Sequence, residues 1–345
     1  MTTTEKSLSF FEFGLSQQML DSLEKKGFET PSPIQTQVIP LLLAGQQNII
    51  GQAATGTGKT AAFGIPLLEK LTPANNPQAI ILVPTRELAI QVAEEINSLQ
   101  AEKKHRLSIL SIYGGQSYDI QLRALKKGVD IVVGTPGRVI DHLNRRTLKL
   151  QEVSYMILDE ADEMLNMGFI DDIEEIFQHT NPDKKVLLFS ATMPKPILNI
   201  AKKYMGEYQL VSVKSQQLTT TQTTQLYFEV REGDKFEALC RIIDIEPDFY
   251  GIVFAKTKLD CDFITTKLNE RGYQAQGLHG DVQQKQRERI LKAFKDKHTR
   301  ILVATDVAAR GIDVNDISHV INYSLPQDTE SYVHRVGRTG RAGKT

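Results

Sequence analysis

Residues 49–60 read IIGQAATGTGKT, and this stretch decides the fold that we expect for the chain. A short apolar run leads into a turn that contains Gly56 and Gly58, and a helical pattern begins at Lys59. Glycines allow a tight turn in which successive backbone N–H groups point at one anion. Lys59 would then reach the outer phosphates of a nucleotide, and the Thr60 hydroxyl would bind a magnesium ion. The stretch predicts a phosphate-binding loop between a strand and a helix.

The first position of this loop departs from the general pattern. Phosphate-binding loops are written G-x-x-x-x-G-K-[ST], and Ala53 stands where the first glycine is expected. A strand-to-helix turn whose glycines serve packing alone is therefore an alternative at this point. The other motifs of the chain decide between the two interpretations.

Length and composition indicate a protein of two domains. A chain of 345 residues is longer than one hydrophobic core usually serves. The net charge is −1, so any nucleic-acid binding must come from local contacts rather than from overall basicity. No apolar run suggests a membrane span, and the polar start is not a secretory signal. Cys240 and Cys261 have neither metal-binding nor disulfide spacing. We expect a cytoplasmic protein with no membrane partner.

Short apolar runs alternate with longer amphipathic stretches between residues 46 and 205, which is typical of β–α units around a parallel sheet. Ligands of such sheets bind at the carboxyl ends of the strands. The expected strands are 48–51, 79–83, 107–112, 130–133, 155–158 and 186–189.

A second alternation follows a segment rich in Gln, Thr and Ser. We expect a first domain at 1–208, a flexible linker at 209–224 and a second domain at 225–345. The end of the sequence has no closing helix signal, so we expect a longer polypeptide. The expected strands of the second domain are 226–230, 252–254, 274–278, 300–304 and 319–322, with helices at 235–245, 258–271 and 284–294.

Acidic residues follow the apolar run 155–158 and read DEAD. A carboxylate at the end of a strand beside a phosphate-binding loop is where ATPases of this type hold magnesium, which makes Asp159 the candidate metal ligand with Thr60. Glu160 is then placed to orient a water for attack on the γ-phosphate. An exposed acidic turn is the alternative.

The ordered set of motifs resembles the DEAD-box RNA helicases of helicase superfamily 2, whose loop A-x-T-G-x-G-K-T fits residues 53–60. The resemblance covers nearly the whole chain. It implies two tandem RecA-like α/β domains, each a parallel sheet flanked by helices, and the use of ATP and Mg²⁺. The motifs are the region 9–37, PTRELA at 84–89, GG at 114–115, TPGR at 135–138, DEAD at 159–162, SAT at 190–192, IVFAKT at 252–257, HGD at 279–281, ATDVAARGID at 304–313 and HRVGRTGR at 334–341.

The resemblance implies a set of ATP contacts. Gln35 would read adenine, for which a primary amide is suited because it donates and accepts in one plane. Phe28 would stack on the base, and Phe10 matches the isolated upstream aromatic of the family; core packing is the alternative for both rings. Asp313 would contact the ribose. The phosphate-binding residues would be Ala53, Ala54, Thr55, Gly56, Thr57, Gly58, Lys59 and Thr60.

The resemblance also implies RNA contacts that read no sequence, because they bind phosphate and sugar. Individually, each of these residues could be an ordinary surface or turn residue. Asp162, Ser190, Thr192 and His334 would couple hydrolysis to strand separation, and Ser190 and Thr192 would do so through hydrogen bonds to the DEAD carboxylates. The implied RNA contacts are Arg86, Gly115, Thr135, Arg138, Thr305 and Arg310.

Arg335, Arg338 and Arg341 recur three residues apart, which predicts one face of a helix and a need for an anion. A surface face of salt bridges is one interpretation. The resemblance implies that Arg338 and Arg341 are arginine fingers, supplied by the second domain to a nucleotide held by the first.

The implied function is an RNA-stimulated ATPase that separates short RNA duplexes or remodels RNA–protein complexes when the two domains close. An ATP-gated RNA clamp or scaffold with little strand separation is the main alternative, and a DNA helicase is a weaker one. Target choice would lie with protein partners or a further tail.

Overall fold

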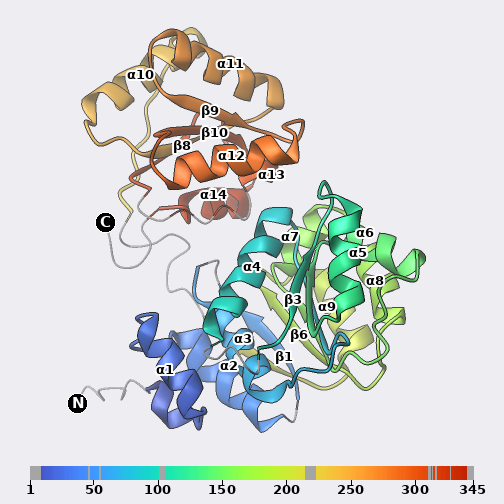
Figure 1. Cartoon of the computed structure of the whole chain (residues 1–345). Helices are drawn as coiled ribbons and strands as arrows, with labels where there is room; N and C mark the ends of the chain where they lie inside the picture. The colour runs from blue at the N-terminus through green and yellow to red at the C-terminus, as the bar shows by residue number, and fades with distance from the viewer. Residues whose placement is uncertain are drawn as a thin grey trace, which may run out of the picture. The chain divides into compact units, whose positions relative to one another are not determined.

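The computed structural model describes residues 9–45, 47–53, 56–100, 106–213, 223–309, 312, 314, 317–326 and 328–339. The chain divides into two compact units, Met1–Ser215 and Gln216–Thr345. In each unit a parallel sheet is flanked by helices (Figure 1). This confirms the α/β fold class that the strand and helix patterns predict.

The first unit contains a seven-stranded sheet with the order β3-β4-β2-β5-β6-β1-β7, in which every pairing is parallel. Five expected strands agree within one or two residues, and Tyr155–Leu158 agrees at both ends. The strands are β1 (Asn48–Gln52), β2 (Ala79–Leu82), β3 (Ile109–Ile112), β4 (Ile131–Gly134), β5 (Tyr155–Leu158), β6 (Lys185–Ser190) and β7 (Tyr208–Ser212).

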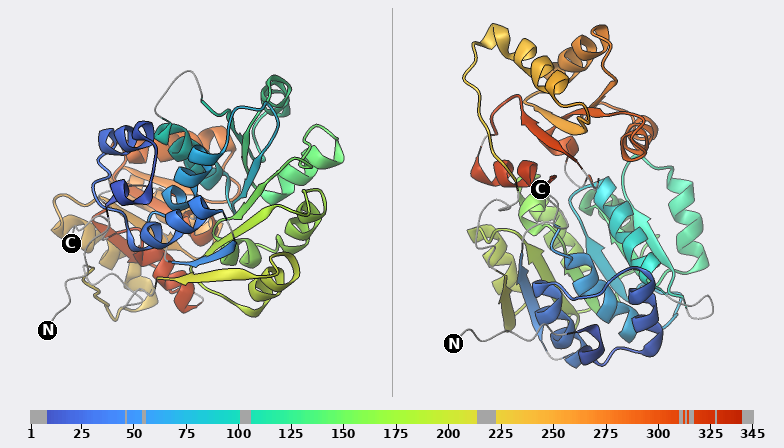
Figure 2. Two further views of the ribbon diagram at one scale, coloured as in Figure 1. Left: turned by 90° about the horizontal axis from the view of Figure 1, so that it is seen from below. Right: turned by 90° about the vertical axis from the view of Figure 1, so that its left-hand side faces the viewer.

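Helices cover both faces of this sheet (Figure 2). Neighbouring side chains of one strand enter different cores, because successive residues point to opposite faces: Ile49 belongs to one cluster and Ile50 to the other. Burial on both faces explains why the strands read as continuous apolar runs. The helices are η1 (Phe10–Phe13), α1 (Gln17–Lys25), α2 (Pro33–Ala44), α3 (Lys59–Lys70), α4 (Arg86–Leu99), α5 (Tyr118–Lys127), α6 (Pro136–Asn144), α7 (Ala161–Asn166), α8 (Ile170–Gln178) and α9 (Lys195–Tyr204).

The second unit contains a four-stranded parallel sheet with the order β11-β8-β10-β9 among the described residues. Helices α10 and α11 pack on one face, and α12 and α13 pack on the other. The elements are η2 (Glu232–Asp234), α10 (Lys235–Ile245), β8 (Gly251–Ala255), α11 (Lys258–Glu270), β9 (Ala275–Leu278), α12 (Gln284–Lys295), β10 (Ile301–Thr305), α13 (Asp306–Ala309), β11 (His319–Asn322) and α14 (Thr329–Val336).

Two expectations near the linker are wrong. The segment expected to begin the linker at 209 lies within β7, which pairs with β1, and Val211 is buried in the first core. The expected strand at 226–230 is not a strand. Its Leu226, Tyr227 and Phe228 are 77%, 86% and 62% exposed, and a short apolar run forms a strand only where a neighbouring strand completes its hydrogen bonds.

No helix in the described ranges combines the length and the apolar character that a membrane crossing requires.

Candidate active site

The strand order of the first unit sorts the motifs along the carboxyl edge of the sheet. The phosphate-binding loop, DEAD and SAT follow β1, β5 and β6, which are neighbours. Arg86, Gly115 and the pair Thr135 and Arg138 follow β2, β3 and β4, which are also neighbours. One half of the edge therefore carries the residues expected to bind nucleotide, and the other half carries those expected to bind RNA.

The phosphate-binding loop ends at Gly58, the residue that precedes α3. Gly58 has φ +85°, a left-handed conformation that favours glycine, and a Cβ there would lie 2.4 Å from Gln35 Nε2. The Lys59 side chain is buried, and its Nζ donates to the Ala53 carbonyl oxygen at 3.3 Å. Nζ also lies 4.0 Å from Asp159 Oδ1. The lysine is thus held beside the acidic motif; Ala54 and Thr55 lie outside the described residues.

Gln35 lies in the first turn of α2 and contacts the phosphate-binding loop. Its Nε2 donates to the Gly58 carbonyl oxygen at 3.1 Å, and its Oε1 accepts from the Ser32 backbone N–H at 2.9 Å. The Ser32 hydroxyl donates to the Thr57 carbonyl oxygen at 2.7 Å. These bonds tie the loop to the N-terminus of α2, while adenine binding by Gln35 stays a prediction.

Phe10 is a core residue in this structure. Its ring is 3% exposed and packs edge-on against Phe13 and Phe28, with ring centroids 5.8 and 6.2 Å apart. Core packing, the alternative for this ring, therefore describes Phe10 here, and its place among the ATP contacts stays a prediction. Phe28 is partly buried in the same cluster, and its stacking stays a prediction.

Asp159 and Glu160 follow β5 and are both buried. Burial raises the pKa of Asp159 to about 6, Lys59 opposes the rise, and the charge of Glu160 adds to it. The Glu160 backbone N–H donates to Asp159 Oδ1 at 3.0 Å. Glu160 itself has φ 52° and ψ 50°, a left-handed conformation that costs a non-glycine residue free energy and is found mostly at functional sites.

Asp159 fits the magnesium ion expected here, and the role of Thr60 as a second ligand stays a prediction. Mg²⁺ is usually held by one or two carboxylates together with substrate phosphates and waters. Asp159 supplies one buried carboxylate whose pKa is raised by burial, so a cation beside it would favour the charged form. No group of three or more His, Cys, Asp or Glu in the described ranges could hold a metal by itself.

Asp162 links the DEAD motif to SAT. Its Oδ2 accepts from the Thr192 backbone N–H at 2.8 Å, from the Thr192 hydroxyl at 3.0 Å and from the Ala191 backbone N–H at 3.1 Å. The Ser190 hydroxyl oxygen accepts from the Asp162 backbone N–H at 3.1 Å. The expected hydrogen bonds between SAT and a DEAD carboxylate are therefore present, and the coupling role stays a prediction.

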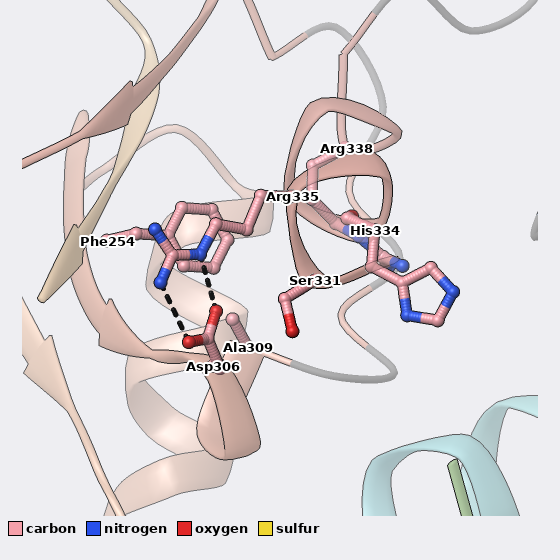
Figure 3. A pocket seen from close by; sticks show the side chains of 7 residues that line it. All are labelled: Phe254, Asp306, Ala309, Ser331, His334, Arg335 and Arg338. Atoms are coloured by element: carbon pink, nitrogen blue, oxygen red, sulfur yellow. Dashed lines mark hydrogen bonds and ion pairs between the residues drawn. The ribbon is translucent and has the colours of Figure 1, made fainter. Parts of the chain in front are cut away.

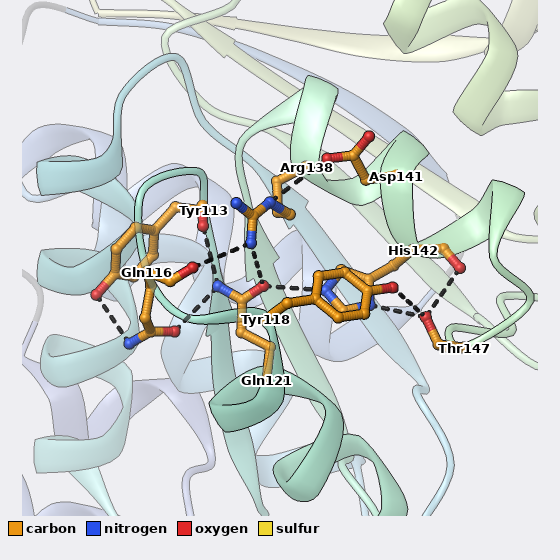
Figure 4. Close-up of polar contacts among 8 residues, drawn as sticks. All are labelled: Tyr113, Gln116, Tyr118, Gln121, Arg138, Asp141, His142 and Thr147. Carbon is orange, nitrogen blue, oxygen red and sulfur yellow. Dashed lines mark hydrogen bonds and ion pairs between the residues drawn. The ribbon is translucent and has the colours of Figure 1, made fainter.

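The other half of the edge presents Arg86, Gly115, Thr135 and Arg138. Arg86 begins α4 and is half-buried, and a Cβ on Gly114 would lie 3.4 Å from its Nη2. Gly115 has φ +88° and is exposed. Figure 4 shows the polar contacts around Arg138, whose Nη1 donates to Gln121 Oε1 at 3.2 Å.

The second unit contributes Thr305 at the end of β10, whereas Arg310, Asp313 and Arg341 lie outside the described residues. The expected helix face of three arginines is wrong, because α14 ends at Val336 and Arg338 lies in the following turn.

Arg335 and Arg338 have different partners (Figure 3). The guanidinium of Arg335 is 2% exposed and pairs with both oxygens of Asp306, at 2.5 and 2.7 Å. Arg338 donates to the backbone carbonyl oxygens of Ile312 and His334, at 2.9 and 3.1 Å. The anion that Arg335 needs is therefore already present, whereas these two acceptors of Arg338 are neutral. Along with Arg338, the partly buried His334 lines the pocket of Figure 3.

Sequence reasoning missed Asp306, Gln121 and His142. Asp306 follows a strand end, as Asp159 does, and this position could have singled it out. Gln121 and His142 belong to no motif, and only the structure shows that both are fully buried.

The chain matches two protein families, described as DEAD/DEAH box helicase over residues 32–200 and helicase conserved C-terminal domain over residues 234–343. The DEAD-box ATP-dependent RNA helicase CshA of Geobacillus kaustophilus is 54% identical over 338 residues, which cover 98% of this chain and 72% of that relative.

Two solved structures extend the likeness to the fold. A DEAD box protein from the hyperthermophile Methanococcus jannaschii is 55% identical, with 97% of this chain and 90% of that chain covered and a TM-score of 0.59. Dbp5 of S. cerevisiae bound to RNA and ADP BeF3 is 34% identical, with 97% and 87% covered and a TM-score of 0.88. Since these matches span both units, the chain belongs to the DEAD-box ATP-dependent RNA helicases.

Proposed function

We propose that this protein is an RNA-stimulated ATPase that separates short RNA duplexes, or remodels RNA–protein complexes, by ATP-driven closure of its two units. The observation that carries the proposal is the division of one sheet edge. The strands β5, β6 and β1 end in nucleotide motifs, and the adjacent strands β3, β4 and β2 end in residues suited to a nucleic-acid backbone. ATP and one strand of RNA would bind side by side on the same rigid sheet.

The nucleotide half would bind ATP and prepare it for hydrolysis. The backbone N–H groups at the start of α3 and the Lys59 ammonium would hold the phosphates. Thr60 and Asp159 would hold Mg²⁺, which when bound neutralises charge on the phosphate oxygens. Glu160 would orient the attacking water, and its strained left-handed backbone conformation supports a functional role for this residue. Asp162 would couple the nucleotide-binding residues to the SAT motif through its hydrogen bonds with Thr192 and Ser190.

The RNA half would bind phosphate and sugar without reading bases. Arg86 and Arg138 supply positive charge, and Gly115 lets the backbone of one strand approach closely. Binding of this kind is independent of sequence and weakens as salt is raised. Preference for RNA over DNA would come from contacts to the 2′-hydroxyl. The likeness to Dbp5, which was solved with bound RNA, supports this half of the proposal.

Closure would bring Arg338 and Arg341 of the second unit to the γ-phosphate. A phosphate is a stronger acceptor than the two carbonyl oxygens, those of Ile312 and His334, to which Arg338 donates in this structure. Because ATP and RNA would both favour the closed state, each would strengthen binding of the other. Moving such an equilibrium from 1:99 to 99:1 requires about 5.5 kcal/mol of differential binding.

The rate of ATP hydrolysis with and without single-stranded RNA tests this proposal. We expect RNA to stimulate hydrolysis, and DNA of the same sequence to stimulate it much less. Lys59→Ala should lower the stimulated rate at least about a hundredfold, because a charged contact to the transferred phosphate is lost. Lys70→Ala, at the exposed end of the same helix, is the matched control and should have little effect. Equal stimulation by RNA and DNA would contradict the RNA assignment, and an active Lys59→Ala would contradict the phosphate site.

A further inference from the structure

The first unit contains a buried polar cluster outside the nucleotide half of the site (Figure 4). It joins α5, α6 and the loop after β3, and Gln121 lies at its centre. Gln121 is fully buried, and it is the buried residue of α5, a helix whose other residues are exposed or half-exposed. A polar side chain in such a position is costly unless its groups are hydrogen-bonded. Burial of Gln121 therefore requires hydrogen-bond partners for both groups of its amide.

The Gln121 amide uses all of its hydrogen-bonding positions. Its Nε2 donates to the Tyr113 carbonyl oxygen at 2.9 Å and to Gln116 Oε1 at 3.0 Å. Its Oε1 accepts from Arg138 Nη1 at 3.2 Å and is 2.9 Å from His142 Nε2. A primary amide has two N–H donors and accepts two hydrogen bonds, so none is left over. Because a carbonyl only accepts and a guanidinium only donates, these partners fix the direction in which the amide faces.

His142 completes the cluster as a neutral ring. Since Gln121 Oε1 is an acceptor, His142 Nε2 must carry the proton, and Nδ1 accepts from the Thr147 hydroxyl at 2.8 Å. The ring of Tyr118 stacks on the imidazole, with centroids 4.4 Å apart and planes 11° apart. Burial and the charge of Arg138 lower the pKa of His142 to about 4, so the ring stays neutral at physiological pH.

These bonds fix the orientation of Arg138. Its Nη1 donates to the Gln116 carbonyl oxygen at 3.4 Å as well as to Gln121, and its Nε lies 3.6 Å from Asp141 Oδ2. In the part of the chain that the structure describes, no hydrogen bond involves Nη2 of Arg138, and its side chain is 15% exposed. The guanidinium is thus anchored through Nη1, and Nη2 is left for an anion.

We propose that Gln121 and His142 are positioning residues for binding the ribose–phosphate backbone of one RNA strand. Gln121 joins the loop that carries Gly115 to Arg138 on α6, so that both meet the same strand in a fixed geometry. Neither residue needs to touch RNA. The inference rests on the proposed RNA contacts of Gly115 and Arg138.

The test compares Gln121→Met with Gln178→Met, the same change at an exposed position in α8. The probe is a labelled ten-nucleotide oligouridylate, and its dissociation constant is measured with a non-hydrolysable ATP analogue at several salt concentrations. Gln121→Met should raise the dissociation constant about tenfold, because one hydrogen bond to a charged group is lost. The slope of the logarithm of the binding constant against the logarithm of the salt concentration should become shallower by about 0.7, because one phosphate contact with a single strand is lost. Nucleotide binding without RNA, and the Gln178→Met protein, should be unchanged.

A double-mutant cycle with Arg138→Ala separates positioning from a general loss of structure. If Gln121 acts through Arg138, most of the effect of Gln121→Met should disappear in the Arg138→Ala background. An equal effect in both backgrounds would overturn the inference, because independent changes add.

Failure of the inference is distinguishable from failure of the proposed function. If the unaltered protein does not bind the oligonucleotide, the proposed function and this inference both fail. If it binds, and Arg138→Ala weakens binding while Gln121→Met does not, only the inference is overturned. Should Gln121→Met not fold, Thr147→Val replaces it in the cycle, because it removes the hydroxyl bonded to His142 and keeps the side-chain size. We expect an effect of about threefold that again disappears with Arg138→Ala, and an additive effect would overturn the inference.

Discussion

Arg335 and Arg338 are three residues apart in sequence and have opposite roles in the structure. Arg335 is buried against Asp306, which makes it part of the scaffold of the second unit. Arg338 donates to two backbone carbonyl oxygens, and the proposed closure would exchange these bonds for bonds to a phosphate. Sequence spacing alone could not separate the two, because the partner of Arg335 comes from another element 29 residues away.

Substitution of each arginine should therefore have a different effect. Arg338→Ala should lower RNA-stimulated hydrolysis about 10³-fold with little change in ATP affinity, as for an arginine finger. Arg335→Ala should instead lower the free energy of unfolding of the second unit by about 2 kcal/mol, less than for a fully buried pair because the Asp306 side chain is 30% exposed. Single-turnover hydrolysis, nucleotide titration and urea unfolding measure the three quantities. Loss of ATP affinity as large as the loss of hydrolysis in Arg338→Ala would contradict the finger role.

His142 should make the first unit less stable in acid. Its pKa is about 4 in the folded protein, against 6.5 for an unperturbed histidine side chain, so the unfolded chain binds the proton more readily. The contribution of the neutral His142 ring to the free energy of unfolding is fully present above pH 6.5. About 3 kcal/mol of it is lost as the pH falls towards 4. Urea unfolding of the unaltered protein and of His142→Gln between about pH 7 and pH 4 measures the difference. The difference in free energy of unfolding between the two proteins should change by this amount over the pH range. A difference that stays constant with pH would contradict the lowered pKa of His142.

At the scale of elements, strand β7 shows what the sequence pattern could not reveal. Most strands and helices were predictable, because buried parallel strands are continuous apolar runs and the helices between them are amphipathic. Residues 208–212 read YQLVS, and only Val211 of these is buried, so an edge strand with one covered residue has almost no apolar signal. At 226–230 the opposite holds, because the apolar run LYFEV predicts a strand and does not form one.

Pairing of β7 with β1 predicts that Val211 stabilises the first unit. Val211→Asp would place a charge in the core that surrounds β1, so we expect the free energy of unfolding to fall by about 3–5 kcal/mol. Gln209→Asp introduces the same charge at an exposed position of the same strand and should change stability by less than about 0.5 kcal/mol. Urea unfolding followed by circular dichroism compares the two. Equal losses would show that β7 does not pack as described.

At the scale of the whole molecule, the motifs identified the family, and the strand order explains why the motifs work together. The sequence contains DEAD, SAT and the phosphate-binding loop at distant positions, and adjacency of β5, β6 and β1 brings them to one edge. Their hydrogen bonds depend on strand register, which the motifs do not specify. A hydrogen bond between SAT and a DEAD carboxylate was expected, and the bond between Thr192 and Asp162 is of this type. The cluster around Gln121 could not be predicted, because no sequence pattern marks a glutamine that faces inward from a polar helix.

ATP-dependent displacement of one strand from a ten-base-pair RNA duplex is the most direct test of the proposed activity. Because each base-pair step costs about 1.4 kcal/mol by analogy with DNA stacking, one closure can open only a few steps. We expect ATP to release the labelled strand from this duplex, with little release from a duplex of about twenty-five pairs and none with ADP. RNA-stimulated hydrolysis without any release from the short duplex would contradict strand separation and show that the protein is an ATP-gated clamp.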